Sequence, residues 1–353
     1  MNMLEPTAIA DPANYTKDEI KGLFVRRFKK DVEDEVGAHF RDRETKVRSV
    51  FATDKEERVL RRLKGLKFHT LDRKGMQGKD ILFKTTLLKS FLSSPEACLE
   101  TIENRLKHVE EKLRGKPTNR ENLENDQQVL EMLRDDVLDV VGAEYSKLLE
   151  LCAYLDSIGW TGKADSPRVI VFSERIKTLH VLNGHLAKRY RVPESAINIF
   201  HAGLPDVDQM KIVEDFGKQD SPVRLLLASD VASEGVNLHY YCNHLVHFDI
   251  PWSLITMEQR NGRIDRYGQN ETPHITYLLT RSEDPEIKAD LRIIDILVKK
   301  EEWAHRNIAM PPRSWPCTTR RRKKNTSRRN CPPARIPIRS SRTCPRRKVS
   351  CPS

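Results

Sequence analysis

The second half of the chain alternates short apolar runs with longer amphipathic stretches. The apolar runs are rich in β-branched residues, as in "RVIVFS", and occupy residues 168–173, 196–201, 223–229, 244–250 and 274–279. Stretches at 174–190, 206–217 and 285–306 separate or follow them and repeat their apolar positions at helical spacing. Strands that alternate with helices in this way are typical of βαβ units around a buried parallel sheet. The pattern therefore predicts an α/β fold with helices flanking the sheet.

The first half of the chain has a mostly helical pattern. Residues 45–53 alternate and predict a strand, whereas helical spacing prevails over residues 54–158. Within that region, residues 97–113 and 126–155 each place an apolar stripe along one face, and the turn-like "RGKPTNREN" separates them. We interpret the pair as a helical hairpin that packs on another part of the protein. Contact with a partner would explain the stripe equally well.

Changes of composition divide the chain into four predicted parts. Residues 1–53 are expected to be a linker or brace, residues 54–160 a helical insertion, and residues 161–309 the α/β lobe. Residues 310–353 form a basic tail. In the first part, residues 20–36 predict a short helix beside a basic cluster, which is either a solvated face or a phosphate contact.

The charge is unevenly distributed along the chain. The 353 residues have a net charge of +11, but residues 310–353 hold 14 Lys and Arg residues and no Asp or Glu. The remaining residues include 48 basic and 51 acidic side chains, a net charge of −3. The total charge therefore gives no nucleic-acid signature for the rest of the chain, where any such surface must be a local patch. The cysteines before residue 310 are scattered, which favours a reducing compartment over a disulfide framework.

The tail is rich in Pro, Arg, Ser and Cys and lacks hydrophobic periodicity, which predicts disorder. Its "RRRKK" run is typical of a nuclear-localisation or nucleic-acid-binding arm. The alternative hypothesis is that the tail is translated in a shifted frame, because purine-rich Lys and Arg codons become Glu codons one frame over. The nucleotide sequence of the gene decides between the two: stop codons in the alternative frame would exclude a shift.

Three polar segments come directly after predicted strands or close behind them. They are "VFSE" (171–174), "ASDVASEGVNL" (228–238) and "QRNGRIDRYGQ" (259–269). Ligands of open parallel sheets bind at the carboxyl ends of the strands. These segments are therefore candidates for parts of one binding site.

The second of these segments has the features of a phosphate contact. The hydroxyl groups of Ser229 and Ser233, with the free N–H groups of a helix start, suit a nucleic-acid backbone. Gly235 permits a strand or sugar to approach closely, and Asn237 can hydrogen-bond a ribose. An ordinary helix N-cap followed by a packing glycine explains the same residues.

The third segment carries Arg260, Arg263 and Arg266, three positions apart. On an α-helix these positions drift by about 60° per step, so all three side chains are expected to reach one side. Guanidinium groups suit phosphate oxygens and stabilise the charge that develops on a transferring phosphoryl group. The alternative is a surface helix whose arginines pair with Asp265 and Glu258.

Together these segments resemble a known family. "RVIVFSE", "LLLASDVASEGVNLHYYCNHLVHFDIPW" and "EQRNGRIDRYGQ" are similar to motifs IV, V and VI of superfamily-two helicases. The last two resemble the Swi/Snf-related group, especially its bacterial RapA-like branch, and "LFVRRFKKDV" resembles the segment that follows the first RecA-like lobe there. The resemblance covers residues 12–308. One departure is Ser253-Leu254, where the group usually has Asn-Pro.

The resemblance implies a RecA-like parallel sheet flanked by helices, forming the second lobe of a motor that binds ATP between two lobes. Arg263 and Arg266 would be arginine fingers, and Gln259 would lie near the γ-phosphate. Four further residues would contact the nucleotide: Asp230, Gly235, Asn237 and Arg260. Six would contact nucleic acid, expected to be double-stranded DNA: Phe172, Ser173, His201, Gly203, Ser229 and Ser233.

The sequence lacks the other half of such an ATP site. No Gly-Lys pair is followed by Ser or Thr in a G-x-x-x-x-G-K-[ST] motif, and no D-E-x-H or D-E-A-D string occurs. We therefore expect ATP and magnesium to bind only if a first lobe on a separate chain completes the site, and the polypeptide alone to be inactive. The alternative is a non-catalytic nucleic-acid-binding or interaction module from a truncated gene.

The remaining expectations concern location and metals. No run of 18 or more apolar residues and no signal peptide is present in the sequence, which predicts no membrane partner. The RapA-like resemblance implies a bacterial protein of the cytoplasm, associated with the nucleoid. No metal site is predicted, because the cysteines lack the paired spacing that structural zinc needs.

Overall fold

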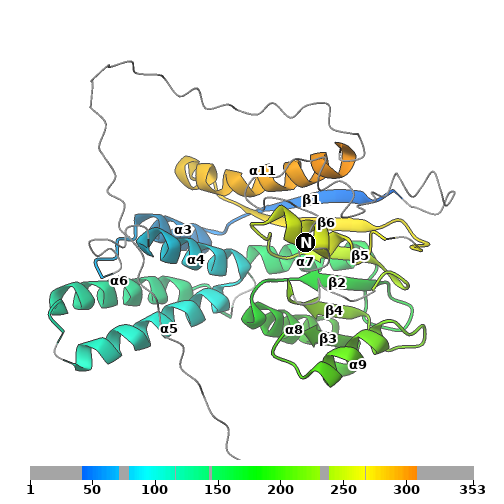
Figure 1. The fold of residues 1–353 in the computed structure, drawn as a ribbon, viewed down its shortest axis with the longest axis horizontal. Coiled ribbons are helices and arrows are strands. Elements are labelled where there is room, and N and C mark those ends of the chain that lie inside the picture. Colours follow the sequence, from blue (N-terminus) through cyan, green and yellow to red (C-terminus); the bar gives the residue numbers. More distant parts are fainter. Residues whose placement is uncertain are drawn as a thin grey trace, which may run out of the picture. The chain divides into compact units, whose positions relative to one another are not determined.

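The computed structural model describes residues 42–70, 79–115, 117–142, 145–230, 238–266 and 268–307. Its centre is a six-stranded sheet in the order β1-β6-β5-β2-β4-β3, in which all neighbours are parallel (Figure 1). The strands are β1 (Glu44–Phe51), β2 (Arg168–Phe172), β3 (Ile197–Phe200), β4 (Leu225–Ala228), β5 (Cys242–His247) and β6 (His274–Arg281). The predicted RecA-like α/β fold is confirmed.

Helices cover both faces of this sheet, which explains why β2 and β4 are buried at every position. Val169 and Val171 pack into one core cluster, whereas Ile170 and Phe172 pack into the other. The first cluster includes residues of α7 (Ser146–Ser157) and α8 (Ile176–Tyr190). The second includes residues of α9 (Asp206–Phe216), α10 (Leu254–Asn261) and α11 (Pro285–Asn307). A 3-10 turn, η1 (Glu194–Ala196), precedes β3.

A helical segment lies between β1 and α7 in the chain. It consists of α3 (Asp54–Gly65), α4 (Lys79–Ser93), α5 (Pro95–Arg114) and α6 (Arg120–Leu138), and α5 and α6 pack side by side (Figure 1). Thr53 and Glu56 form a capping box that starts α3, and Ser94 caps α5, with Pro95 in its first turn. The buried residues of this helical segment belong to the same core cluster as Val169 and Val171.

Most predicted elements are present, and one prediction is wrong. The strand predicted at 45–53 is β1, and the later strands and helices lie within a few residues of their predicted positions. The single helix predicted over 126–155 is instead two helices, α6 and α7. Gly142 has a φ of 77°, a left-handed conformation that interrupts a helix. Hydrophobic periodicity alone missed this break, because both halves bury apolar residues at the same spacing.

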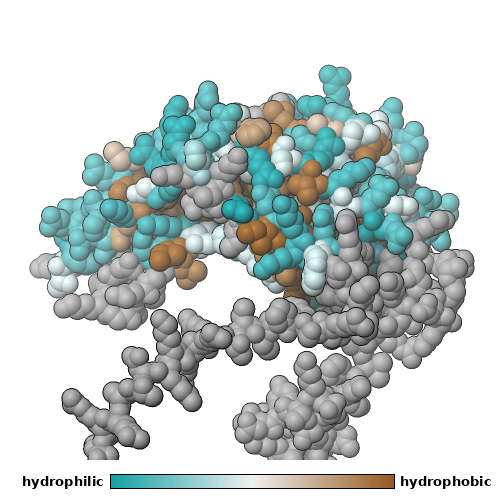
Figure 2. Space-filling view, turned by 90° about the horizontal axis from the view of Figure 1, so that it is seen from above, coloured by the Kyte–Doolittle hydropathy of each residue, from teal (hydrophilic) through white to brown (hydrophobic). Residues whose placement is uncertain are grey.

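The four-part division of the chain stays a prediction. β1 pairs with β6 along its whole length, so an element of the predicted linker is an edge strand of the sheet. The N-terminal helix with its basic cluster and the C-terminal tail lie outside the described residues. Among the helices that are described, none is both long and apolar enough to span a bilayer. Figure 2 shows a mainly hydrophilic face with scattered hydrophobic residues.

A histidine pair marks the start of β5 and β6. The rings of His244 and His274 stack with centroids 4.9 Å apart, and Tyr154 Oη lies 2.9 Å from His244 Nδ1. Burial, and then the nearby charges of His274 and Lys46, lower the pKa of His244 to about 4. The folded protein therefore holds His244 neutral at pH values at which an unfolded chain binds a proton.

This histidine predicts acid lability of the fold. Between its ordinary pKa of about 6.5 and about 4, the unfolded state binds more protons, so stability is lost as the pH falls. We expect the free energy of unfolding to be about 1–2 kcal/mol lower at pH 5 than at pH 7, after allowance for solvent screening. Urea unfolding at both pH values measures the difference, which His244→Gln should reduce by about 1 kcal/mol. An equal loss in both proteins would contradict this assignment.

Candidate functional site

The carboxyl ends of β2, β4 and β5 lie at one edge of the sheet, because the strands are parallel and adjacent. Asp249, two residues after β5, joins the ends of β2 and β5. Its Oδ2 accepts a hydrogen bond of 2.7 Å from Ser173 Oγ, and its Oδ1 accepts one of 2.9 Å from the backbone N–H of Glu174. Burial, and then the charge of Asp249, raise the pKa of Glu174.

Two residues that the resemblance placed along a nucleic-acid track lie inside the protein. Phe172 and Ser173 are both fully buried. Phe172 belongs to the second core cluster, and Ser173 binds Asp249. The short run "VFS" gave no sign of this, because a strand end can present its last residues either to solvent or to the core.

Arg260 is fully buried although it lies near the end of a short helix. Its Nε donates to Asp230 Oδ1 at 2.7 Å, and its Nη1 donates to the carbonyl oxygen of Asp249 at 3.0 Å. Its Nη2 lies 2.5 Å from Asp230 Oδ1. The guanidinium carbon lies 5.2 Å from the centre of the Phe172 ring. Arg260 thereby joins the last residue of β2 to the segments that follow β4 and β5.

The three arginines do not share one helix face, so that prediction is wrong. α10 ends at Asn261 with Gly262 as its C-cap, and Arg263 and Arg266 lie in the turn and bend beyond it. Arg260 points into the protein, whereas Arg263 is half-buried and Arg266 is exposed. The predicted i, i+3, i+6 alignment does not form, because the helix ends one residue after Arg260. We refer to residues 259–266 as the arginine segment.

Arg263 and Arg266 have neighbours other than the partners of Arg260. Arg263 Nε donates to the carbonyl oxygen of Gln259 at 3.2 Å, and Gln259 itself is exposed. Arg266 lies near the buried His239, whose pKa is lowered by burial and then by the arginine's charge. The predicted fingers thus lie at the outside of a segment that Arg260 anchors from within.

The segment after β4 is only partly described. Ser229 is buried, and its hydroxyl has no hydrogen-bond partner among the residues that the structure describes, whereas Asp230 binds Arg260. Ser233, Gly235 and Asn237 lie outside the described residues.

The remaining track candidates follow β3. Gly203 is exposed, and its N–H donates to His201 Nδ1 at 3.0 Å. The ring of His201 packs edge-on against His180 of α8, and burial followed by that neighbour lowers its pKa. His201 and Gly203 therefore form one local loop structure beside the carboxyl edge.

Known proteins are similar to the part of the chain that forms the carboxyl edge of the sheet. The family model of the helicase conserved C-terminal domain matches residues 146–268. This region is a helicase C-terminal domain. The match spans β2 to the arginine segment, so all the strand ends described above fall inside the domain.

The helicase C-terminal domain is similar to that of RapA proteins, which confirms the predicted resemblance. RNA polymerase-associated protein RapA of Vibrio parahaemolyticus is 31% identical over 118 residues, 33% of this chain and 12% of that protein. RapA of Photobacterium profundum is 34% identical over 113 residues, 31% of this chain and 11% of that protein. The chain thus spans about an eighth of the length of these relatives.

A solved structure is also similar to the chain. The C-terminal part of the Fun30 ATPase domain aligns with a TM-score of 0.45 at 13% identity. The alignment covers 75% of this chain and 99% of that one.

A second set of buried polar contacts holds the arginine segment of the helicase C-terminal domain. Asn261 Oδ1 lies 2.8 Å from His247 Nε2, and its Nδ2 donates to Tyr277 Oη at 3.0 Å and to Glu301 Oε1 at 2.9 Å. Glu301 also accepts from Arg43 Nη2 at 2.6 Å. Sequence reasoning missed these residues because they lie on separate elements. The sequence offered one sign of this network, Asn261, a polar residue next to Arg260 in a stretch that turns out to be buried.

Asp249 is the other functional candidate that sequence reasoning missed. It lies in the quoted "FDIPW", but its partners Ser93 and Ser173 are 156 and 76 positions away in the sequence. Ser253, which stands where the Swi/Snf-related group usually has Asn, starts a helix in this domain. Its side chain accepts a hydrogen bond from the N–H of Thr256 and caps α10.

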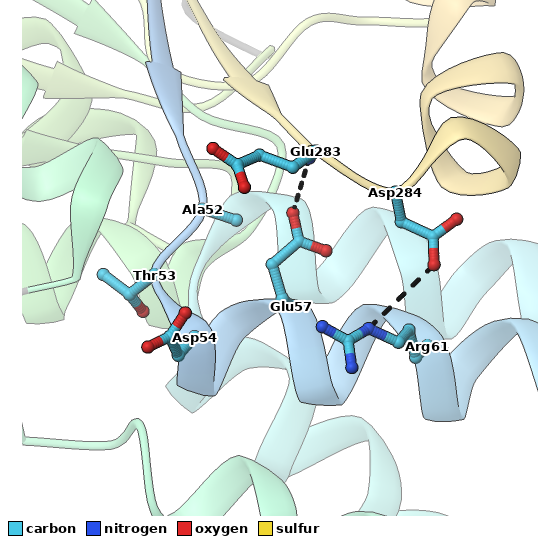
Figure 3. A pocket seen from close by; sticks show the side chains of 7 residues that line it. All are labelled: Ala52, Thr53, Asp54, Glu57, Arg61, Glu283 and Asp284. Atoms are coloured by element: carbon cyan, nitrogen blue, oxygen red, sulfur yellow. Dashed lines mark hydrogen bonds and ion pairs between the residues drawn. The ribbon is translucent and has the colours of Figure 1, made fainter.

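A separate pocket of about 520 Å³ lies between the start of α3 and the turn before α11 (Figure 3). Two of its acidic side chains, those of Glu57 and Asp284, have structural partners. Glu57 Oε1 accepts from the N–H of Glu283 at 2.9 Å, and Arg61 pairs with Asp284 at 4.0 Å. In the described ranges, no group of three or more His, Cys, Asp or Glu residues is arranged to hold a metal ion.

Proposed function

We propose that this chain supplies the second lobe of a nucleic-acid-dependent ATPase of the Swi/Snf type, with Arg263 and Arg266 as arginine fingers. The observation that carries the proposal is the anchoring of the arginine segment. Arg260 and Asn261 hold it from inside, and Arg263 and Arg266 follow directly outside. A fixed support is what a charge-stabilising group needs, because it then requires no reorganisation during the reaction.

In this proposal, ATP lies between this lobe and a first lobe. Two guanidinium groups fit the oxygens of a γ-phosphate, and Gln259 is exposed on the same segment. Gly235, Asn237 and Asp230 would contact the nucleotide, and Arg260 would act from behind by holding Asp230. Magnesium would need the carboxylate pair of the first lobe.

We also propose that double-stranded DNA crosses this lobe beside the loop after β3. His201, Gly203, Ser229 and Ser233 would contact its backbone, since hydroxyl and backbone N–H groups position phosphates without reading sequence. We propose that Phe172 and Ser173 support this surface from inside and do not touch the DNA, because both are buried, Phe172 against Arg260 and Ser173 against Asp249.

An ATPase assay tests the central proposal. The purified chain should release no phosphate from ATP above background, with or without double-stranded DNA. Addition of a polypeptide that carries the P-loop lysine and Asp-Glu pair, encoded upstream of this chain's gene, should produce DNA-stimulated turnover. Activity of the chain alone would refute the need for a first lobe. Absence of any turnover in the mixture, together with DNA binding by the chain, would favour the non-catalytic module.

A further inference from the structure

The junction between α4 and α5 reaches the carboxyl edge of the sheet. Ser93, the last residue of α4, is almost fully buried, and its Oγ donates to Asp249 Oδ2 at 2.7 Å. The same hydroxyl lies 2.8 Å from Thr178 Oγ1 of α8. Ser93 is thus the point at which the helical segment α3–α6 bonds to the site.

The junction is held from a second side by a buried lysine. Lys147 of α7 donates from Nζ to the carbonyl oxygen of Leu92 at 2.7 Å, and its ammonium lies 4.9 Å from the Phe248 ring centre. Burial lowers the pKa of Lys147 to about 8, although the charge of Asp249 opposes the shift. A small cavity of about 30 Å³, lined in part by Leu92, Lys147 and Asp249, lies beside the junction.

Asp249 connects this junction to the arginine segment. One side of its carboxylate, Oδ2, accepts from Ser93 and Ser173. Its own carbonyl oxygen accepts from Arg260 Nη1, and its Oδ1 lies 3.8 Å from Arg260 Nη2. A hydroxyl has one proton, and both serines direct theirs to this carboxylate. The backbone N–H of Glu174 also donates to Oδ2, at 3.0 Å. Loss of either serine hydroxyl therefore removes one of three donors that fix the position of this buried carboxylate.

We propose that Ser93 and Asp249 are positioning residues for the arginine segment. A displacement of the helical segment at the α4–α5 junction changes the placement of Asp249, then of Arg260, and then of Arg263. The helical segment is therefore a control element for the fingers, and an event that moves α4 alters catalysis without contact with the nucleotide. The predicted effect on catalysis rests on the proposed function. The coupling from Ser93 through Asp249 to Arg260 does not rest on it, because this coupling requires neither nucleotide nor a first lobe.

Amide hydrogen exchange of the full chain tests the coupling. We expect Ser93→Ala to speed exchange in α10 by about threefold or more, relative to the exchange in β2 and β4, which reports global opening. Ser90→Ala is the matched control. Ser90 is equally buried in α4, but within the described ranges its hydroxyl bonds only to Thr86, Leu87 and Thr101, all within α4 and α5.

A double-mutant comparison separates positioning from general loss of stability. If Ser93 acts through Asp249, then adding Ser93→Ala to Asp249→Asn should change α10 exchange by less than about twofold. The proposal is overturned if Ser93→Ala leaves relative α10 exchange unchanged, if Ser90→Ala raises it equally, or if the two effects multiply. Because no ATP is present, these outcomes are independent of the ATPase result.

Discussion

Replacement of Arg260 with alanine is expected to lower the free energy of unfolding by about 3 kcal/mol. The guanidinium is fully buried and bonds to Asp230 and to Asp249. Its removal leaves the carbonyl oxygen of the buried Asp249 without this donor, takes away the partner of Asp230, and removes the group that covers the Phe172 ring. Arg260→Lys should recover only part of the loss, since a single ammonium cannot reproduce the planar fork. Urea denaturation followed by circular dichroism measures these differences.

Arg263→Ala is the matched control for this prediction. It makes the same chemical change three positions later, at a half-buried residue outside α10. We expect a cost below about 1 kcal/mol, as for most substitutions near the surface. Equal destabilisation by the two substitutions would contradict the conclusion that Arg260 is the internal anchor of the arginine segment.

The second large effect concerns catalysis by Arg263. In the two-polypeptide ATPase assay, Arg263→Ala should lower kcat by about 10³-fold, the lower bound for loss of an arginine finger. Arg266→Ala should act in the same direction, because both side chains lie on the outer side of the anchored segment. The folded state should persist, so the circular dichroism spectrum and the unfolding midpoint should stay close to those of the unsubstituted chain.

One control variant and two alternative outcomes make the kinetic result specific. Arg292 is exposed on α11, and Arg292→Ala should leave kcat unchanged within about twofold. Turnover by the Arg263→Ala mixture at the unsubstituted rate would remove Arg263 from the list of fingers, whatever its effect on binding. A rise in KM without a fall in kcat would instead indicate ground-state binding alone.

The strands of the sheet were predictable because each is a short apolar run that needs helices on both faces. The arginines were recognisable as a set because guanidinium groups at regular spacing are rare without an anionic partner. The family resemblance then followed from "FDIPW" and the arginine segment, and the RapA relatives confirm it. The break between α6 and α7 was not predictable, because periodicity continues across it while Gly142 turns the backbone.

The sequence by itself determined the class of fold, the order of its elements and which residues are candidates for chemistry. Only the tertiary structure decided which of those candidates face inward. Arg260, Phe172 and Ser173 looked like ligand contacts, yet they are buried, because α10 ends at Asn261 and Asp249 collects donors from distant elements. A hydrogen bond between Ser93 and Asp249 joins residues 156 positions apart. Local propensity fixes elements over a few residues, whereas the partner of a buried polar group is fixed only when those elements pack.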